Sequence, residues 1–432
     1  MEFRVDRDDL VQKFLSFVKI ETTSNEDNAA TPSSECQWNL AKILKEELQR
    51  IGLDNVRLDD HCYIYGVLPE SLPAGSPRAG KIPAVGLIAH MDVSPAVSGK
   101  DVKPIIHRNY DGGPIRLPGA PELVLTPEND KPLGECKGLD IITSDGTTLL
   151  GADDKAGIAI ILSVLQFLQK NPEVPHGPVH VAFTPDEEIG RGVDKFDVEG
   201  FGAEVAYTLD GAGQGEVEDE TFCADAMDVT FRGINVHPGY AKNKMINSIK
   251  LASELIEMLP KNAMSPETTA ERQGYVHPMS VKGNEELTEL KFLIRDFTDA
   301  GLKELERTLE EKVRAVEKAH PGCSAETKVK HSYKNMKVML DQRPETTAFA
   351  EEAIRAAGIK VHKNPIRGGT DGARLSFLGL PTPNLSAGGL NFHGKTEWVP
   401  IQYMENAATV CLHLLQLWAE KGEKKGLLPK VD

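Results

Sequence analysis

The sequence is poor in cysteine and has no long apolar run, and both absences narrow the class of protein. Six cysteines occur in 432 residues, and no two are spaced as a CxxC pair. They stand at positions 36, 62, 136, 223, 323 and 411. Because disulfide scaffolds are small and dense in cysteine, this spacing predicts free thiols in a reducing compartment. The longest apolar run, near Ile158 to Leu165, is much shorter than the ~18 residues that a membrane-spanning helix needs.

Positive charge is also scarce relative to negative charge. The chain has 49 Lys and Arg against 65 Asp and Glu, which gives a formal net charge of −16. The electric field of this negative charge repels phosphate backbones and anionic lipid, so neither nucleic acid nor a membrane surface is an expected partner. The N-terminal residues MEFRVDRDDL have no basic stretch followed by an apolar one, which argues against a signal peptide. Together these features predict a soluble, cytoplasmic protein.

Apolar periodicity divides the chain into two patterns. Residues 1–221 and 335–432 alternate helices with short apolar strands, such as 84–89 and 179–184. Uniformly apolar strands between helices are typical of a parallel sheet covered on both faces. Residues 222–334 instead follow the order β-α-β-β-α-β of a ferredoxin-like unit. We therefore predict an α/β catalytic domain with a mixed, mostly parallel sheet and flanking helices, interrupted by an inserted α+β lid domain at 222–334.

Polar residues that could bind metal follow several of these strands. His90 and Asp92 come directly after strand 84–89, where open α/β sheets bind ligands. A histidine that binds a metal usually gives its other ring nitrogen to a carboxylate, and Asp92 could be that partner. Asp153 and Asp154 stand between small residues just before an apolar helix. Either could simply cap that helix, or one of them could bridge two cations.

Three further segments carry candidates. The acids 186–188 follow strand 179–184 and would repel one another without a cation, although a solvated turn is the alternative. Asp210 ends an apolar strand and His393 stands in a glycine-bordered loop; each alone would more readily be structural. As a set, imidazoles and carboxylates without thiolate suit zinc, cobalt or manganese. One spare glutamate could be a general base, but spacing does not decide between Glu187 and Glu188.

Longer motifs add a family resemblance that runs in order over nearly the whole chain. They are IAHMDVSP, TLLGADDKAGIAI, HGPVHVAFTPDEEIGRG, AYTLDG, NVHPGYAK, IRDF, PIRGGTDGARLSFLGLPTPNL and NFHGKTEWV. These strings resemble the peptidase T family of tripeptide aminopeptidases, within the dinuclear-zinc exopeptidases that also include carboxypeptidase and deacylase relatives. The resemblance implies a small peptide as substrate and two zinc ions per subunit. By analogy, the insert would be the surface through which a homodimer forms.

The resemblance also implies roles for individual residues. Glu187 would be the general base, Asp92 would lie behind His90, and a cis peptide would join Asp153 to Asp154. Five residues would bind zinc: His90 and Asp210 the first ion, Glu188 and His393 the second, and Asp153 both.

Substrate recognition is implied for three residues of the motifs. Arg295 and Arg367 would hold the peptide's C-terminal carboxylate, because a guanidinium binds that group in a bidentate manner. His237 would steady the oxyanion or reach a partner subunit's site. An ion pair between Arg295 and the adjacent Asp296 is the structural alternative.

Two other functions stay open at this stage. The same metal motifs serve dipeptidases, carboxypeptidases and N-acyl amino-acid hydrolases, since fold does not determine function. An inactive relative that acts as a binding protein is the second alternative, and it would be expected to have lost at least one of these acids or histidines.

Overall fold

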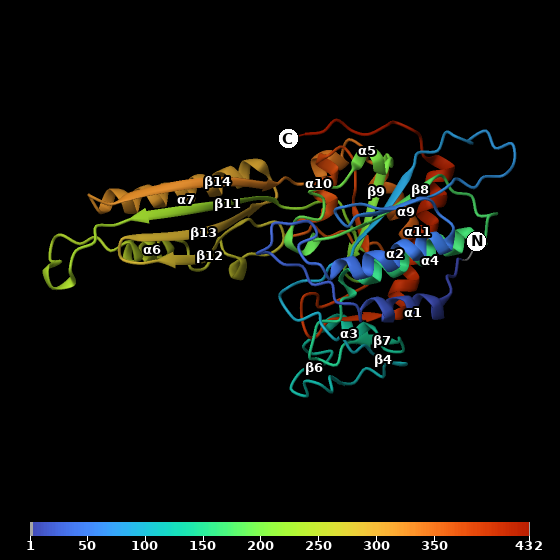
Figure 1. Cartoon of the computed structure of the whole chain (residues 1–432), viewed down its shortest axis with the longest axis horizontal. Coiled ribbons are helices and arrows are strands. Elements are labelled where there is room, and N and C mark those ends of the chain that lie inside the picture. The colour runs from blue at the N-terminus through green and yellow to red at the C-terminus, as the bar shows by residue number, and fades with distance from the viewer. Residues whose placement is uncertain (1–2, 432) are drawn as a thin grey trace. The chain divides into compact units, whose positions relative to one another are not determined.

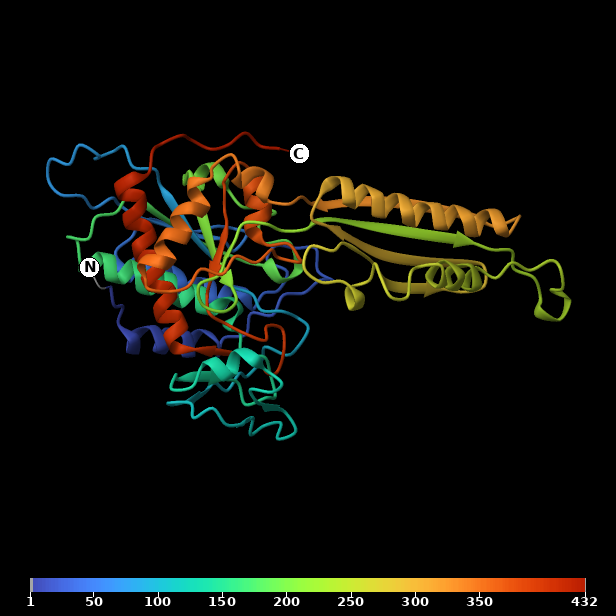
Figure 2. The same ribbon diagram turned by 180° about the vertical axis from the view of Figure 1, so that it is seen from behind.

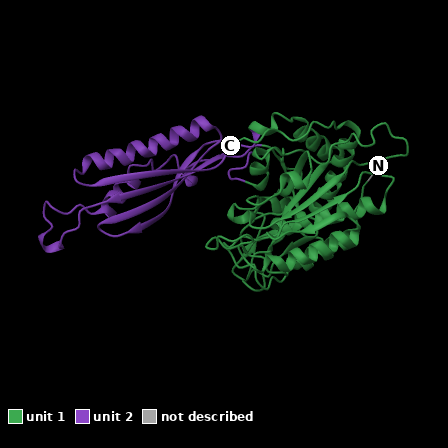
Figure 3. Cartoon of the chain, turned by 45° about the horizontal axis from the view of Figure 1, so that its top comes forward, with its two compact units in different colours: residues 1–219, 338–364, 370–432 green, residues 220–337, 365–369 purple. Residues whose placement is uncertain are grey.

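The computed structural model describes residues 3–431, so the outermost residues of the predicted catalytic domain, 1–2 and 432, lie outside it. The chain divides into two compact units (Figure 3). Unit 1 comprises the residues up to 219, residues 338–364 and the residues from 370 onward. Unit 2 comprises residues 220–337 and 365–369. No helix in the described part of the chain is long and apolar enough to cross a membrane.

Unit 1 is built on a seven-stranded sheet with the strand order β1-β2-β8-β3-β9-β15-β10. Figure 1 labels β8 and β9 of this sheet. The strands are β1 Asp54–Leu58, β2 Ile64–Leu68, β8 Val179–Thr184, β3 Val85–His90, β9 Val205–Gly211, β15 Asn384–Ser386 and β10 Val217–Glu218. The four strands from β8 to β15 are parallel to one another, and the outer pairings are antiparallel. The predicted mixed sheet is thus confirmed, with its parallel part at the centre.

Helices cover both faces of this sheet. The larger apolar core lies under five helices: α1 Arg7–Phe17, α2 Gln37–Ile51, α4 Ala152–Lys170, α9 Glu345–Ala356 and α11 Ile401–Lys421. The smaller core on the opposite face lies under α5 Val198–Phe201 and α10 Asp371–Phe377. Figure 2 shows α9 and α11 side by side, in agreement with their many mutual contacts. Double coverage explains why β3 is buried along its whole length.

A smaller lobe of unit 1 was not predicted from the sequence. It holds a three-stranded sheet of β4 Ile105–His107, β7 Ile141–Thr143 and β16 Trp398–Pro400. A hairpin of β5 Ile115–Arg116 and β6 Val124–Leu125 and the short helix α3 Lys131–Glu135 complete it. These strands are two or three residues long, and β16 pairs with a segment more than 250 residues earlier in the chain. Neither feature leaves a periodic pattern in the sequence.

Unit 2 has a four-stranded antiparallel sheet with the strand order β12-β13-β11-β14. Its elements are β11 Cys223–Arg232, α6 Ser248–Glu257, β12 Tyr275–Gly283, β13 Leu287–Asp296, α7 Asp299–Ala319 and β14 Ser324–Tyr333. This is the predicted ferredoxin-like order. Leu309, Val313 and Val316 of α7 are buried in a core of the unit's own.

One buried carboxylate interrupts that core. Asp225 of β11 is opposite His331 of β14 in the register, and its side chain is 4% exposed. Glu306 of α7 faces Asp225. Burial and a hydrogen bond with Asp225 raise the pKa of Glu306 to about 8, so this pair keeps a proton at neutral pH.

Candidate active site

The site candidates of unit 1 gather where neighbouring strands end. Strand β3 lies between β8 and β9 and is parallel to both, so the carboxyl ends of the three strands meet at one edge. His90 is the last residue of β3, Asp210 is the next-to-last residue of β9, and the acids 186–188 follow β8. In open α/β sheets this edge is where ligands bind.

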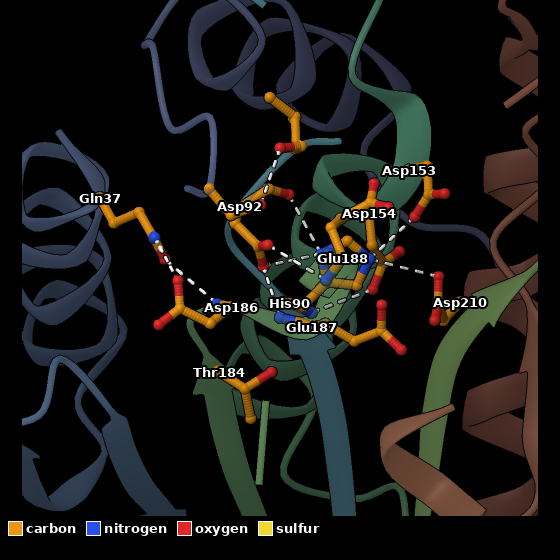
Figure 4. A network of polar contacts seen from close by, with 12 residues as sticks. Gln37, His90, Asp92, Asp153, Asp154, Thr184, Asp186, Glu187, Glu188 and Asp210 are labelled. Atoms are coloured by element: carbon orange, nitrogen blue, oxygen red, sulfur yellow. Dashed lines mark hydrogen bonds and ion pairs between the residues drawn. The ribbon is translucent and has the colours of Figure 1, made fainter. Parts of the chain in front are cut away.

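Two imidazoles and three carboxylates face one another there, and Figure 4 shows His90 close to Asp153, Glu188 and Asp210. The Nε2 atom of His90 lies 2.8 Å from Asp153 Oδ1 and 3.5 Å from Asp210 Oδ1. The Nε2 atom of His393 lies 3.1 Å from Asp153 Oδ2 and 2.7 Å from Glu188 Oε2. The structure therefore brings together all five predicted zinc ligands, and each oxygen of Asp153 faces a different imidazole.

Asp153 and Asp154 have different roles although they are adjacent. A cis peptide bond joins them, as the family resemblance implied. Asp154 is completely buried; its Oδ2 accepts the backbone N–H of His90 at 3.2 Å and its Oδ1 accepts that of Gly157 at 3.1 Å. The bond to Gly157, three residues further on, is a helix N-cap bond. Asp154 thus caps the regular part of α4, which leaves Asp153 to face the imidazoles.

The acids 186–188 also separate by role. Asp186 has a left-handed backbone, with φ at 59°, and its carboxylate accepts hydrogen bonds from Gln37 and Ser33 of the segment that leads into α2. Glu188 faces His393. Glu187 lies beside it in a single 3₁₀ turn, 187–189. Of three consecutive acids, one anchors the turn and two remain for the site.

Asp92 connects the end of β3 to this turn. Its side chain is fully buried, and His90 Nδ1 lies 3.1 Å from its backbone carbonyl oxygen and 3.4 Å from its Oδ1. The same carboxylate accepts the backbone N–H of Glu187 at 3.0 Å and that of Glu188 at 3.1 Å. Asp92 is therefore placed to orient both the imidazole of His90 and the two glutamates.

The electrostatics of the cluster follow from burying several acids together. Burial and the charge of Asp153 raise the pKa of Asp210 to about 7 and that of Glu188 to about 7. Hydrogen bonds to Asp153 and Glu188 raise the pKa of His393 to about 10, against the effect of its burial. Burial, with the charge of Asp210, raises the pKa of Glu187 well above its usual value. A buried group of this kind needs protons or cations to offset its negative charge.

The donor set fits a metal centre. Ligand atoms of His90, Asp153 and Glu188 all lie within 4.8 Å of one another. Glu188 Oε1 is buried and has no hydrogen-bond partner in the described part of the chain. An unpaired buried carboxylate oxygen is costly, and a cation would satisfy it. Asp154 is close to His90 and Asp210 as well, but its oxygens are taken by backbone N–H groups.

Two buried acids at the site were missed by the sequence reasoning. Asp371, the first residue of α10, accepts a hydrogen bond from Thr184 Oγ1 at 2.9 Å beside the end of β8. Glu397 accepts backbone N–H groups of the segment that carries Asp153. Glu397 stands four residues after His393, and that short spacing is the one signal that could have suggested it.

The three predicted substrate residues lie in unit 2. His237 is exposed; its Nδ1 accepts the N–H of Gly239, and its ring contacts Tyr240. Arg295 donates to the carbonyls of Asp225 and Ile294 at 3.1 and 3.0 Å. The carboxylate of Asp296, the proposed structural partner of Arg295, instead accepts hydrogen bonds from Thr298.

Arg367 also binds backbone carbonyls. Its Nη1 donates to Glu271 at 2.7 Å and to Gln273 at 2.9 Å, and its guanidinium lies 5.7 Å from the ring of Tyr275. Tyr275 is the register partner of Arg295. Within unit 2 both arginines therefore lie near Tyr275.

Comparison with known proteins supports the family resemblance over most of the chain. Residues 146–417 match the family model described as Peptidase family M20/M25/M40. Peptidase T of Clostridium perfringens is 47% identical over 410 residues, which is 95% of this chain and 99% of that protein. These matches confirm the resemblance that the sequence motifs indicated.

Two solved structures have the same fold. A tripeptidase of Staphylococcus aureus has a TM-score of 0.76 at 22% identity and covers 97% of this chain and 100% of its own. The aminopeptidase PepT of Bacillus cereus has a TM-score of 0.73 at 22% identity and covers 96% of this chain and 100% of its own. The predicted fold class is thereby confirmed.

Proposed function

The chain belongs to the M20/M25/M40 family of peptidases, and from this we propose that it is a dinuclear zinc aminopeptidase that removes the N-terminal residue of tripeptides. The observation that carries the metal chemistry is the pairing of each Asp153 oxygen with a different imidazole. The preference for tripeptides rests on the relatives, since the similar proteins are called Peptidase T and a tripeptidase.

The two metal positions follow from the ligand pairs. His90 and Asp210 would hold one zinc ion, Glu188 and His393 the other, and Asp153 would bind both. Two zinc ions sharing a carboxylate lower the pKa of a water molecule and polarise the scissile carbonyl. The raised pKa values of Asp210, Glu188 and His393 mean that metal binding would release protons from these side chains.

Glu187 is the residue we assign as general base. It is adjacent to Glu188, and Asp92 holds its backbone N–H. A base must lie near the attacking water while its carboxylate stays off the metal, and Glu188 rather than Glu187 pairs with His393. Glu187 would take the proton of the water and deliver it to the amine of the leaving peptide. Asp92 supports this step by orienting His90 and both glutamates.

Recognition of both ends of the peptide would select the length of the substrate. Arg295 and Arg367 would bind the C-terminal carboxylate of the peptide, exchanging some of their bonds to backbone carbonyls for bonds to substrate. His237, which is exposed, would stabilise the oxyanion. Binding both peptide ends favours one length of substrate.

A panel of peptides tests the function. We would measure release of the N-terminal amino acid from a tripeptide, its N-acetyl form, its C-terminal amide, the dipeptide and the tetrapeptide, with zinc and with a chelator. Zinc-dependent cleavage of the free tripeptide alone is the expected result. Preferred cleavage of the N-acetyl form or the dipeptide would instead indicate a deacylase or a dipeptidase on the same fold.

A further inference from the structure

Glu397 joins two loops that carry proposed zinc ligands. It lies four residues after His393, and its backbone N–H donates to Gly394 at 3.2 Å within the same loop. Its side chain leaves this loop and contacts the segment 150–153. One oxygen, Oε2, accepts the N–H groups of Leu150 at 2.8 Å and Gly151 at 2.7 Å. The other, Oε1, accepts the N–H of Asp153 at 3.0 Å.

These three bonds hold the segment that comes just before the regular part of helix α4, which Asp154 caps. Helix α4 begins at Ala152, and the residue before it is Gly151, which has no side chain and adopts a left-handed backbone with φ at 81°. Backbone N–H groups that are buried in such a segment need acceptors, because an unpaired buried donor is costly. Here the acceptor is a carboxylate from a segment more than 240 residues away in the chain. Glu397 is 1% exposed, so water does not compete for these bonds.

We propose that Glu397 is a positioning residue that sets the distance between Asp153 and His393 for metal binding. The proposal rests on the proposed function. His393 Nε2 already lies 3.1 Å from Asp153 Oδ2, so a small shift of either loop would change the spacing of the two metal positions. Glu397 is bonded to the backbone of Asp153 and covalently linked to the loop of His393, and it therefore limits both shifts at once.

Glu397→Gln tests this with little change in volume. The amide oxygen can replace Oε2 and keep the bonds to Leu150 and Gly151. The amide NH₂ then faces the N–H of Asp153, so an acceptor becomes a donor at the residue that would bridge the metals. Loss of such an outer partner typically weakens metal binding or activity by about 10- to 100-fold.

Asp130→Asn is the matched control. Asp130 is also buried, and its Oδ2 accepts Asn391 Nδ2 and Trp398 Nε1, both at 2.7 Å, from the two ends of the same loop. It contacts the loop of His393 but makes no bond to Asp153. An asparagine at this position can present its oxygen to both donors.

The measurements are zinc affinity of the full chain by chelator competition, the melting temperature of the metal-free protein, and tripeptide turnover at saturating zinc. We expect Glu397→Gln to bind zinc about 10- to 100-fold more weakly than wild type, with a metal-free melting temperature close to that of Asp130→Asn. Wild-type zinc affinity in Glu397→Gln would overturn the proposal, as would equal losses of affinity in both variants. If the wild-type chain binds zinc but cleaves no peptide, the proposed function fails while the role of Glu397 in metal binding can still be measured.

Discussion

Replacement of Gly157 by alanine is expected to destabilise unit 1 although it adds a good helix former. Gly157 lies in α4 where that helix packs on β9. An added Cβ would lie 2.2 Å from the carbonyl oxygen of Leu209 and 2.4 Å from Asp154 Oδ1. Leu209 precedes Asp210 in the chain and Asp154 follows Asp153, so either shift would disturb a proposed zinc ligand.

The magnitude follows from two opposing effects. Alanine is favoured over glycine by about 1 kcal/mol inside a helix. Extra volume in a packed core costs about 1–3 kcal/mol, and the upper end applies because Leu209 contributes backbone of a buried central strand. If Asp154 moves instead, it gives up its bonds to the N–H groups of His90 and Gly157, and an unpaired buried donor costs about 1–3 kcal/mol. We therefore expect a net loss of about 2 kcal/mol in the free energy of unfolding.

Denaturant unfolding of the metal-free protein measures this loss, and Gly134→Ala is the control. Gly134 lies in helix α3, and the nearest heavy atom to an added Cβ is 3.4 Å away, an ordinary contact. We expect Gly134→Ala to stay within about 0.5 kcal/mol of wild type. Wild-type stability and zinc affinity in Gly157→Ala would refute the close packing of α4 on β9.

Three further predictions concern the base, the metals and unit 2. Glu187→Gln should lower kcat for the tripeptide by about 10²- to 10⁴-fold with zinc affinity near that of wild type; near-native turnover would exclude Glu187 as the base. A chelator should abolish activity and lower the melting temperature, and zinc should restore both, because a ligand that binds only the folded state stabilises it; activity that survives complete metal removal would contradict the metal site. Burial raises the pKa of Glu306 from 4.5 to about 8, so the folded state holds a proton that the unfolded state has lost, and the stability of unit 2 should fall as pH rises through that interval. Glu306→Gln should flatten this pH dependence in thermal melts. An unchanged slope would show that the pair of Glu306 and Asp225 does not cause the pH dependence.

The elements that depend on local pattern could be predicted from the sequence. Strand 179–184 has the predicted bounds, because an apolar run depends only on neighbouring residues. The proximity of His90 and Asp210 follows from the same kind of pattern, because the parallel strands β3 and β9 end at one edge of the sheet.

The division of roles among adjacent acids could not be predicted in the same way. Asp154 caps α4 while Asp153 faces the imidazoles, and this depends on the backbone at Gly151 and on the bond from His90. Asp186 is an anchor because Gln37 and Ser33, about 150 residues earlier in the chain, donate to it. Glu397 is a similar case, since its partners are distant in sequence. Long-range contacts give these chemically similar side chains different roles, and the linear sequence pattern does not contain those contacts.

The zinc positions themselves provide the most direct test of the account. Crystals of the zinc-loaded chain should be measured at the zinc absorption edge and their anomalous difference maps calculated. We expect two peaks about 3.5–4 Å apart, one on each side of the Asp153 carboxylate, with His90 and Asp210 at one and Glu188 and His393 at the other. No peak at this cluster, or a single ion that does not contact Asp153, would contradict the two-metal site on which the proposed peptidase activity rests.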